Sequence, residues 1–257
     1  MRRVGAELPV AEGLAYGVGG QSLDVYRGGG LQEPLPVALL WHGRGADERD
    51  VLAPLASAVA AAGVLVLVPD WRPDAPDAGR SHLAESVAFA RRNAARFGGD
   101  PERFVLAGWS LGAKAAIGVA LNPDGLDGWR PTAVVGIAGG YGTAAPTTGA
   151  VPLDDLLGAG APPPPTPVWL LHGTADTAVD VRQSRALRAA LQRLGGRVTL
   201  VEADSDHAGV IMAEYDPASA RCRPSTAAHA RRAGARAARL VARAAGAGAQ
   251  REDRMTV

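Results

Sequence analysis

The stretch Gly108-Trp109-Ser110-Leu111-Gly112 decides the fold that this sequence predicts. It ends an apolar run over residues 103–109, typical of a buried strand, and opens a helical pattern over residues 111–121. A strand that turns sharply into a helix strains the backbone at the serine, and glycine on either side prevents clashes. We therefore expect the Ser110 hydroxyl to be held out at the end of a strand, where the N-terminus of a helix favours developing negative charge.

On both sides of this stretch, short runs rich in β-branched residues and leucine alternate with longer amphipathic or alanine-rich runs. Such alternation predicts βα units around a mostly parallel sheet flanked by helices. We expect strands over residues 21–27, 36–42, 64–69, 103–109, 132–138, 167–172 and 197–203. We expect helices over residues 47–62, 81–97, 111–121, 179–194 and 219–245.

The length and composition fit one globular domain. The 257 residues, 47% hydrophobic and 21% charged, are enough to bury one large core, so residues 1–257 are expected to form a single α/β domain. The segment 139–167 is rich in Gly, Pro, Thr and Ala and is either a small cap over a site or a stiff surface connector. Residues 247–257 are expected to form a frayed tail.

Charge and cysteine content argue against several classes of protein. The net charge of +1 gives no general attraction to nucleic acid or to an acidic membrane. The single cysteine, Cys222, excludes an internal disulfide and a thiolate metal site. The chain begins without the apolar region of a secretory signal, and no apolar run reaches about 18 residues. We therefore expect a cytoplasmic protein without a membrane span.

A serine hydroxyl is a poor nucleophile unless a histidine takes its proton and a carboxylate orients that histidine. His207 follows the strand expected at 197–203, and Asp176 follows the strand expected at 167–172. Because the carboxyl ends of parallel strands meet at one edge of a sheet, both are expected near Ser110. Three other carboxylates compete with Asp176 for the role of acid, namely Asp180, Asp204 and Asp206.

Acyl transfer to a serine also requires N–H groups that bind the negatively charged oxygen of the intermediate. One is expected to be the backbone N–H of Leu111, directly after the serine. The other is expected from the turn after Trp41-His42-Gly43, either from Arg44 or from Gly45. Glycine in this turn lets the main chain approach a substrate closely, although a simple Gly-rich turn before a helix is the alternative.

Beyond these residues, three stretches carry a resemblance to a known family: His42-Gly43, Pro69-Asp70-Trp71-Arg72-Pro73, and the residues from Phe97 to Phe104 that lead into the strand before the serine. With the serine, acid and histidine in that chain order, the sequence from about residue 36 to residue 209 resembles the α/β-hydrolase superfamily. Within it, the chain is similar to hormone-sensitive-lipase-like esterases and arylformamidases. It departs from them at Arg44 and at Ala113-Lys114, where glycine is usual.

The resemblance implies an α/β-hydrolase fold with a mixed sheet, a serine acyl-enzyme mechanism, and neither a metal nor an organic cofactor. The sequence thus predicts a serine hydrolase that cleaves a small to medium carboxylic ester, with a small-molecule ester as its partner. Trp71, Trp109 and Tyr141 are expected near the carboxyl ends of strands, either lining the substrate pocket or packed in the core. Hydrolysis of an amide or formamide, acyl transfer, cyclisation and ligand binding remain alternatives on the same fold.

Overall fold

The structure is a computed structural model that describes residues 10–29, 34–122, 126–158 and 164–247. The strands are β1 (Ala11–Tyr16), β2 (Gln21–Tyr26), β3 (Leu35–Trp41), β4 (Leu65–Pro69), β5 (Gly99–Trp109), β6 (Ala133–Ile137), β7 (Val168–Gly173), β8 (Val198–Ala203), β9 (Ala213–Asp216) and β10 (Arg221–Pro224). The α-helices are α1 (Arg49–Ala61), α2 (Arg80–Asn93), α3 (Leu111–Leu121), α4 (Pro152–Leu157), α5 (Arg182–Arg193) and α6 (Ala228–Ala244). Two short 3-10 helices are η1 (Ala94–Phe97) and η3 (Gly209–Ile211).

Eight strands form one sheet in the order β1-β2-β4-β3-β5-β6-β7-β8. The first two strands are antiparallel to their neighbours, and all pairs from β4–β3 to β7–β8 are parallel. The register aligns Trp109 at the end of β5 with Ile137 at the end of β6, and Gly173 at the end of β7 with Ala203 at the end of β8. The loops that follow these strands therefore begin at one edge of the sheet, and the predicted mostly parallel sheet flanked by helices is confirmed.

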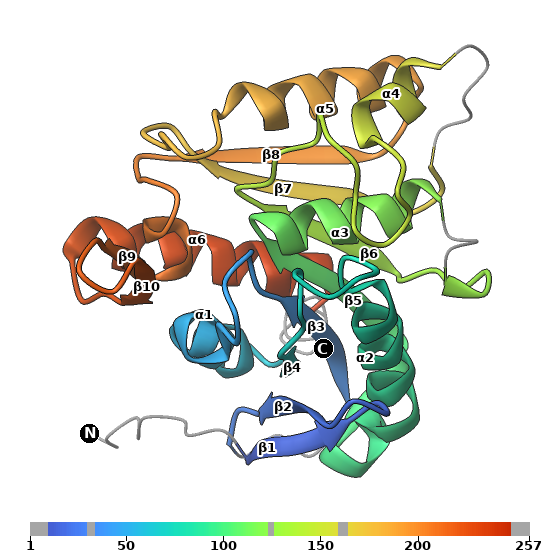
Figure 1. Cartoon of the computed structure of the whole chain (residues 1–257), viewed down its shortest axis with the longest axis vertical. Helices are drawn as coiled ribbons and strands as arrows, with labels where there is room; N and C mark the ends of the chain where they lie inside the picture. Colours follow the sequence, from blue (N-terminus) through green and yellow to red (C-terminus); the bar gives the residue numbers. More distant parts are fainter. Residues whose placement is uncertain (1–9, 30–33, 123–125, 159–163, 248–257) are drawn as a thin grey trace, which may run out of the picture.

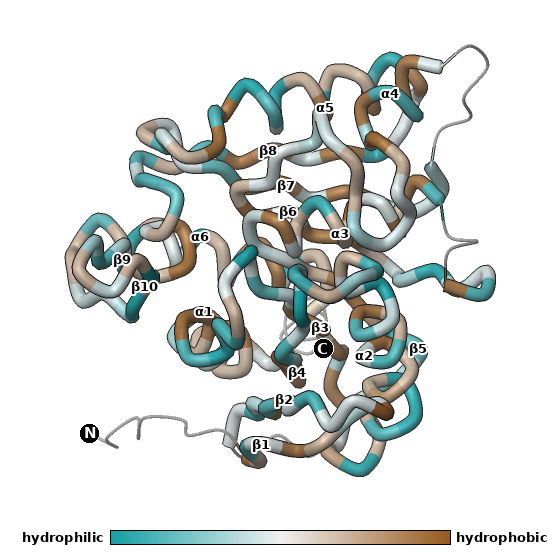
Figure 2. The backbone as a smooth tube through the Cα atoms, in the orientation of Figure 1, coloured by the Kyte–Doolittle hydropathy of each residue, from teal (hydrophilic) through white to brown (hydrophobic). Residues whose placement is uncertain are grey.

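Helices cover both faces of this sheet. In Figure 1, α1 and α6 lie on one face, and α2, α3 and α5 lie on the other. Side chains alternate along β5, so that Val105 and Ala107 join the core under α1 and α6, whereas Phe104 and Leu106 join the core under α3. Figure 2 shows the apolar residues concentrated in the strands between the helical layers. Burial of this kind stabilises the fold by about 25 cal/mol for each Å² of apolar surface removed from water.

The seven predicted strands correspond to β2–β8, but the strands β1, β9 and β10 and the helices α4 and η3 were not predicted. The helix expected over residues 219–245 is wrong before Ala228, because residues 221–224 pair with β9 as an antiparallel hairpin. The turn is fixed by Asp216, whose carboxylate accepts hydrogen bonds from the Ala218 N–H and the Ser219 hydroxyl, each at 3.0 Å. The residues expected to form the first turns of the helix therefore form a hairpin, whose turn is stabilised by the Asp216 side chain.

The described part of the Gly/Pro-rich segment 139–167 lies over α3 and α5. Its short helix α4 contacts both of these helices, and the Thr147 hydroxyl donates a 2.8 Å hydrogen bond to the carbonyl of Ala115 in α3. Residues 159–163 of this segment and residues 248–257 of the predicted tail lie outside the described residues. Across the described ranges, no helix combines the length and the apolar character needed to cross a membrane.

Candidate active site

Ser110 occupies the sharp turn between β5 and α3. Its backbone φ is +56°, a left-handed conformation that is strained for a residue with a side chain, and its N–H donates to the carbonyl of Ile137 at 2.9 Å. Only glycine fits at the two flanking positions, because any side chain there would clash with the backbone. A Cβ on Gly112 would lie 2.4 Å from the carbonyl oxygen of Trp41, and a Cβ on Gly108 would lie 2.2 Å from the backbone of Gly112. The turn predicted from the sequence is thus present, with the serine at its apex.

The structure brings together the three residues that the sequence predicts as a catalytic triad. The Nε2 atom of His207 lies 3.0 Å from the Oγ of Ser110, and its Nδ1 atom lies 2.7 Å from an Oδ2 oxygen of Asp176. Because a carboxylate only accepts hydrogen bonds, Nδ1 carries the ring proton of the neutral imidazole. Nε2 then presents a lone pair to the serine hydroxyl, which is the arrangement that a general base requires.

Of the carboxylates that competed with Asp176, Asp180 and Asp206 bind elsewhere. Asp180 accepts the backbone N–H of Arg182 at 2.8 Å and pairs with its guanidinium at 2.7 Å. Asp206 accepts the N–H of Gly209 at 2.6 Å. Asp204 is exposed, and no hydrogen bond or ion pair joins it to His207 in the described part of the chain.

A second histidine, His172, also contacts Asp176, and the sequence analysis did not assign it a place in the site. Its Nε2 lies 3.2 Å from Asp176 Oδ2 and 2.9 Å from the carbonyl of Val179, and its Nδ1 lies 2.7 Å from the hydroxyl of Ser184. Both neighbours of Nε2 are acceptors, so Nε2 carries the proton and the Ser184 hydroxyl donates to Nδ1. The spacing His-x-x-x-Asp at the end of a strand was the available sequence signal.

The Asp176 carboxylate is buried and yet held ionised. Burial by itself raises the pKa of this group, but hydrogen bonds from His172 and His207 outweigh burial and hold the pKa of Asp176 well below its ordinary value. The other oxygen of the carboxylate accepts the backbone N–H groups of Ala178 and Val179 at 2.9 and 2.8 Å. Asp176 is therefore held as the ionised carboxylate and fixed in orientation by these hydrogen bonds.

This ionisation leads to a prediction about stability in acid. We expect the difference in unfolding free energy between the wild type and Asp176→Asn to shrink as the pH falls from about 5 to about 2. The carboxylate stabilises the folded protein fully above the pKa of the unfolded chain, about 3.9, and that contribution is lost as the pH falls through the lower folded-state pKa. Urea unfolding at stepped pH measures the difference, with Asp127→Asn at an exposed carboxylate as the control. A difference that stays constant over this range would contradict the prediction.

Trp109 lies beside His207. Its indole Nε1–H donates to the backbone carbonyl of His207 at 2.9 Å, and the two ring centroids are 5.2 Å apart. The structure places the other two aromatic residues expected in the pocket, Trp71 and Tyr141, fully inside the core with no exposed surface. Trp71 donates its indole N–H to the carbonyl of His42 at 3.2 Å. Trp71 and Tyr141 are therefore packed in the core, which was the stated alternative to lining the substrate pocket.

The predicted backbone donors lie on the two segments that meet at the Ser110 turn. Leu111 is the first residue of α3, where the helix leaves its N–H without an intrahelical partner. The loop after β3 lies against the same turn, because a Cβ on Gly112 would be 2.5 Å from the carbonyl oxygen of His42. Within that loop, the Gly45 N–H already donates to the buried carboxylate of Glu48 at 3.2 Å. Because the Gly45 N–H is already engaged, the Arg44 N–H is left as the predicted second donor to the oxyanion.

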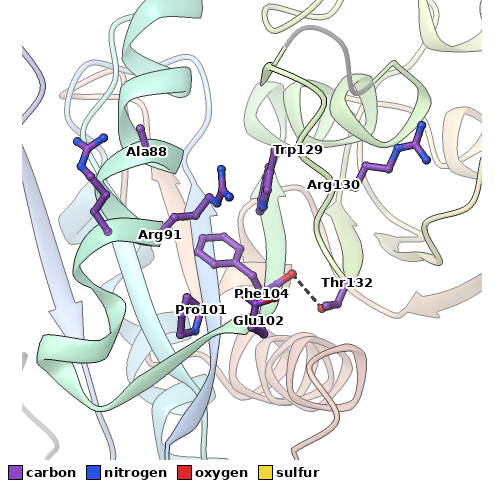
Figure 3. A pocket seen from close by; sticks show the side chains of 9 residues that line it. Ala88, Arg91, Pro101, Glu102, Phe104, Trp129, Arg130 and Thr132 are labelled. Atoms are coloured by element: carbon purple, nitrogen blue, oxygen red, sulfur yellow. Dashed lines mark hydrogen bonds between the residues drawn. The ribbon is translucent and has the colours of Figure 1, made fainter.

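The opposite edge of the sheet carries a separate hollow of about 510 Å³. Figure 3 shows that residues from α2, from the start of β5 and from the segment before β6 line it. There, Arg91 lies over the ring of Trp129 at 5.5 Å, and Phe104 meets the same ring edge-on. The described residues contain no group of three or more His, Cys, Asp or Glu side chains arranged to hold a metal ion.

Comparison with known proteins places the fold. No model of a protein family matches the sequence, and no curated protein matches it. Among the similar solved structures is a putative dienelactone hydrolase from Klebsiella pneumoniae, with 19% identity over 86% of this chain and 92% of that one and a TM-score of 0.63. Carboxyl esterase 2 from Tuber melanosporum has 16% identity over 81% of each chain and a TM-score of 0.61. Thermogutta terrifontis esterase 2 phosphorylated by paraoxon has 17% identity over 80% of this chain and 87% of that one and a TM-score of 0.60. The chain has the α/β-hydrolase fold.

Proposed function

We propose that this protein is a serine hydrolase that cleaves small to medium carboxylic esters through an acyl-enzyme intermediate. The observation that carries the proposal is the continuous hydrogen-bonded series from Ser110 through His207 to Asp176, with distances of 3.0 and 2.7 Å. This series activates a hydroxyl that is otherwise a weak nucleophile. The similarity to solved esterases supports an ester as the substrate.

The reaction follows from this geometry. His207 Nε2 takes the proton of Ser110 as the serine Oγ attacks the ester carbonyl, and the resulting oxyanion accepts hydrogen bonds from the N–H groups of Leu111 and Arg44. Collapse of this intermediate breaks the bond to the alcohol oxygen, which receives the proton from His207. Water then attacks the acyl-enzyme with His207 again as base, and this second cycle releases the carboxylic acid and restores the Ser110 hydroxyl.

A fluorophosphonate tests the nucleophile without knowledge of the natural substrate. We expect the folded protein to gain one phosphonyl adduct, visible by intact mass, because an activated serine displaces fluoride from phosphorus. Trypsin should place the adduct on the peptide Phe104–Lys114, which contains Ser110 as its single serine. Protein unfolded in urea is the control, since it keeps the serine but loses the base. A folded protein that stays unlabelled, or an adduct on another peptide, would overturn the proposal.

A further inference from the structure

The only lysine of the sequence, Lys114, lies one helical turn after Ser110. Its backbone N–H donates to the carbonyl of Ser110 at 3.3 Å. Lys114 thus lies in the first turn of α3, at the end of the helix that joins Ser110. The side chain is half-buried, and its ammonium donates to the hydroxyl of Thr143 in the loop after β6. Lys114 therefore lies at the edge of the sheet that carries Ser110, between the start of α3 and the loop after β6.

No negative charge compensates this ammonium within the described chain. Thr143, its hydrogen-bond partner, is neutral, and no described carboxylate forms an ion pair with Lys114. Burial and then the nearby positive charge of Arg44 lower the pKa of Lys114, and no acidic group contributes to the shift. Two cations near each other, neither paired with a described carboxylate, give this edge a positive potential.

Arg44 adds the second charge from the loop after β3. This loop is held against the serine turn, since a Cβ on Gly43 would lie 3.0 Å from the ring of Trp109. The Arg44 side chain is exposed and has no ion-pair partner in the described ranges, whereas Arg49, Arg182 and Arg185 each bind a carboxylate. No carboxylate of the described chain therefore neutralises the Arg44 charge at this rim.

The carboxylates closest to the site are all directed elsewhere. Asp176 faces His207, and Glu48 is buried against the Gly45 N–H. Asp70 lies 3.5 Å from the ring of His42, and Asp206 bonds the Gly209 N–H with its second oxygen 3.9 Å from His229. None of them forms an ion pair with Lys114 or Arg44, so a bound anionic group would meet two cations that lack a carboxylate partner in the described chain.

We propose that the substrate is an ester that also carries a free carboxylate, which the Lys114 ammonium and the Arg44 guanidinium bind beside Ser110. This inference rests on the proposed hydrolase function and specifies its substrate class. A charge-assisted hydrogen bond to a carboxylate is about twice as strong as one between neutral groups, and it is strongest when it is shielded from bulk water. The half-buried ammonium meets that condition better than an exposed lysine does. Such binding selects acidic esters over neutral esters of equal size.

Two matched ester pairs test this selectivity. Mono-(4-nitrophenyl) adipate and 4-nitrophenyl hexanoate differ by a carboxylate in the acyl part, whereas 4-carboxyphenyl and 4-carbamoylphenyl butyrate differ by one in the leaving group. We expect the wild type to favour the acidic member of one pair by about tenfold or more in kcat/KM. The pair that shows the preference tells which part of the substrate carries the charge. The preference should decrease as salt is raised, because screening weakens the attraction.

Variants at Lys114 assign the preference to this residue. Lys114→Met removes the charge at similar length and should reduce the ratio of acidic to neutral kcat/KM about tenfold, whereas Lys114→Arg should retain most of it. Arg92→Gln removes a positive charge at the opposite edge of the sheet, so it controls for net charge and should leave the ratio unchanged. The ratio is the readout, because a general loss of folded protein affects both esters equally.

Several results would overturn the inference. A wild-type ratio near one or below one for both pairs would do so, as would a ratio that Lys114→Met leaves at the wild-type value. If Lys114→Met fails to fold, the test rests on the wild type, in which an acidic-to-neutral kcat/KM ratio that does not fall with rising salt would overturn the inference. Fluorophosphonate labelling separates the two proposals: labelled protein without acidic preference contradicts this inference alone, and unlabelled, inactive protein contradicts the hydrolase function itself.

Discussion

Replacement of Ser110 by alanine is expected to lower kcat for 4-nitrophenyl hexanoate about a millionfold while leaving the fold intact. In the proposed mechanism the substitution removes the oxygen that forms the acyl bond, and nothing else in the series from His207 to Asp176 supplies a nucleophile at that position. The backbone conformation at residue 110, with φ at +56°, is imposed by β5 and α3 on either side and not by the hydroxyl. Far-UV circular dichroism should therefore match that of the wild type.

The control for this variant is Ser219→Ala. Ser219 lies in the exposed turn between β9 and β10, where its hydroxyl bonds Asp216. Its replacement should change kcat by no more than about twofold, because surface substitutions of this kind have small effects. Initial rates at saturating ester, corrected for spontaneous hydrolysis, measure both variants. Activity of Ser110→Ala within about a hundredfold of the wild type would mean that another group attacks the ester.

The strands of the central sheet could be predicted from the sequence because both faces of the sheet are covered. A strand buried on both faces, such as β3, is apolar at nearly every position and stands out as a short run. The hairpin of β9 and β10 has no such run: its strands are half-buried, contain charged residues, and owe their pairing to the turn at Asp216. Pro224 inside the expected helix was a signal against that helix.

The contact between the serine, histidine and acid could be anticipated because parallel strands fix which loops meet. The contacts that tune the site could not, since they depend on how each loop folds. His172 reaches Asp176 because the loop after β7 turns back over the strand end, where the Ala178 and Val179 N–H groups hold the carboxylate. The bond from the Gly45 N–H to Glu48 likewise depends on a loop conformation that residue spacing leaves open.

The second large effect is expected at the acid. Asp176→Asn should lower kcat about ten-thousandfold, less than the loss of Ser110 itself. An amide in place of the carboxylate removes the charge that stabilises protonated His207 during attack. Its NH2 group also hydrogen-bonds the lone pair of Nδ1 in the other tautomer, which places the ring proton on Nε2, where it blocks acceptance of the Ser110 proton.

Asp176→Asn disturbs two histidines, because His172 contacts the same carboxylate as His207. Both His172 and His207 approach the Oδ2 oxygen, at 3.2 and 2.7 Å. An amide NH2 in that position forces His207 into the other tautomer and still faces the ring N–H of His172, and an amide turned the other way faces the backbone N–H groups. Asp180→Asn, four residues later at an exposed carboxylate paired with Arg182, is the matched control and should keep kcat within about twofold. Activity of Asp176→Asn within about tenfold of the wild type would show that His207 acts without its carboxylate, and that the acid lies elsewhere.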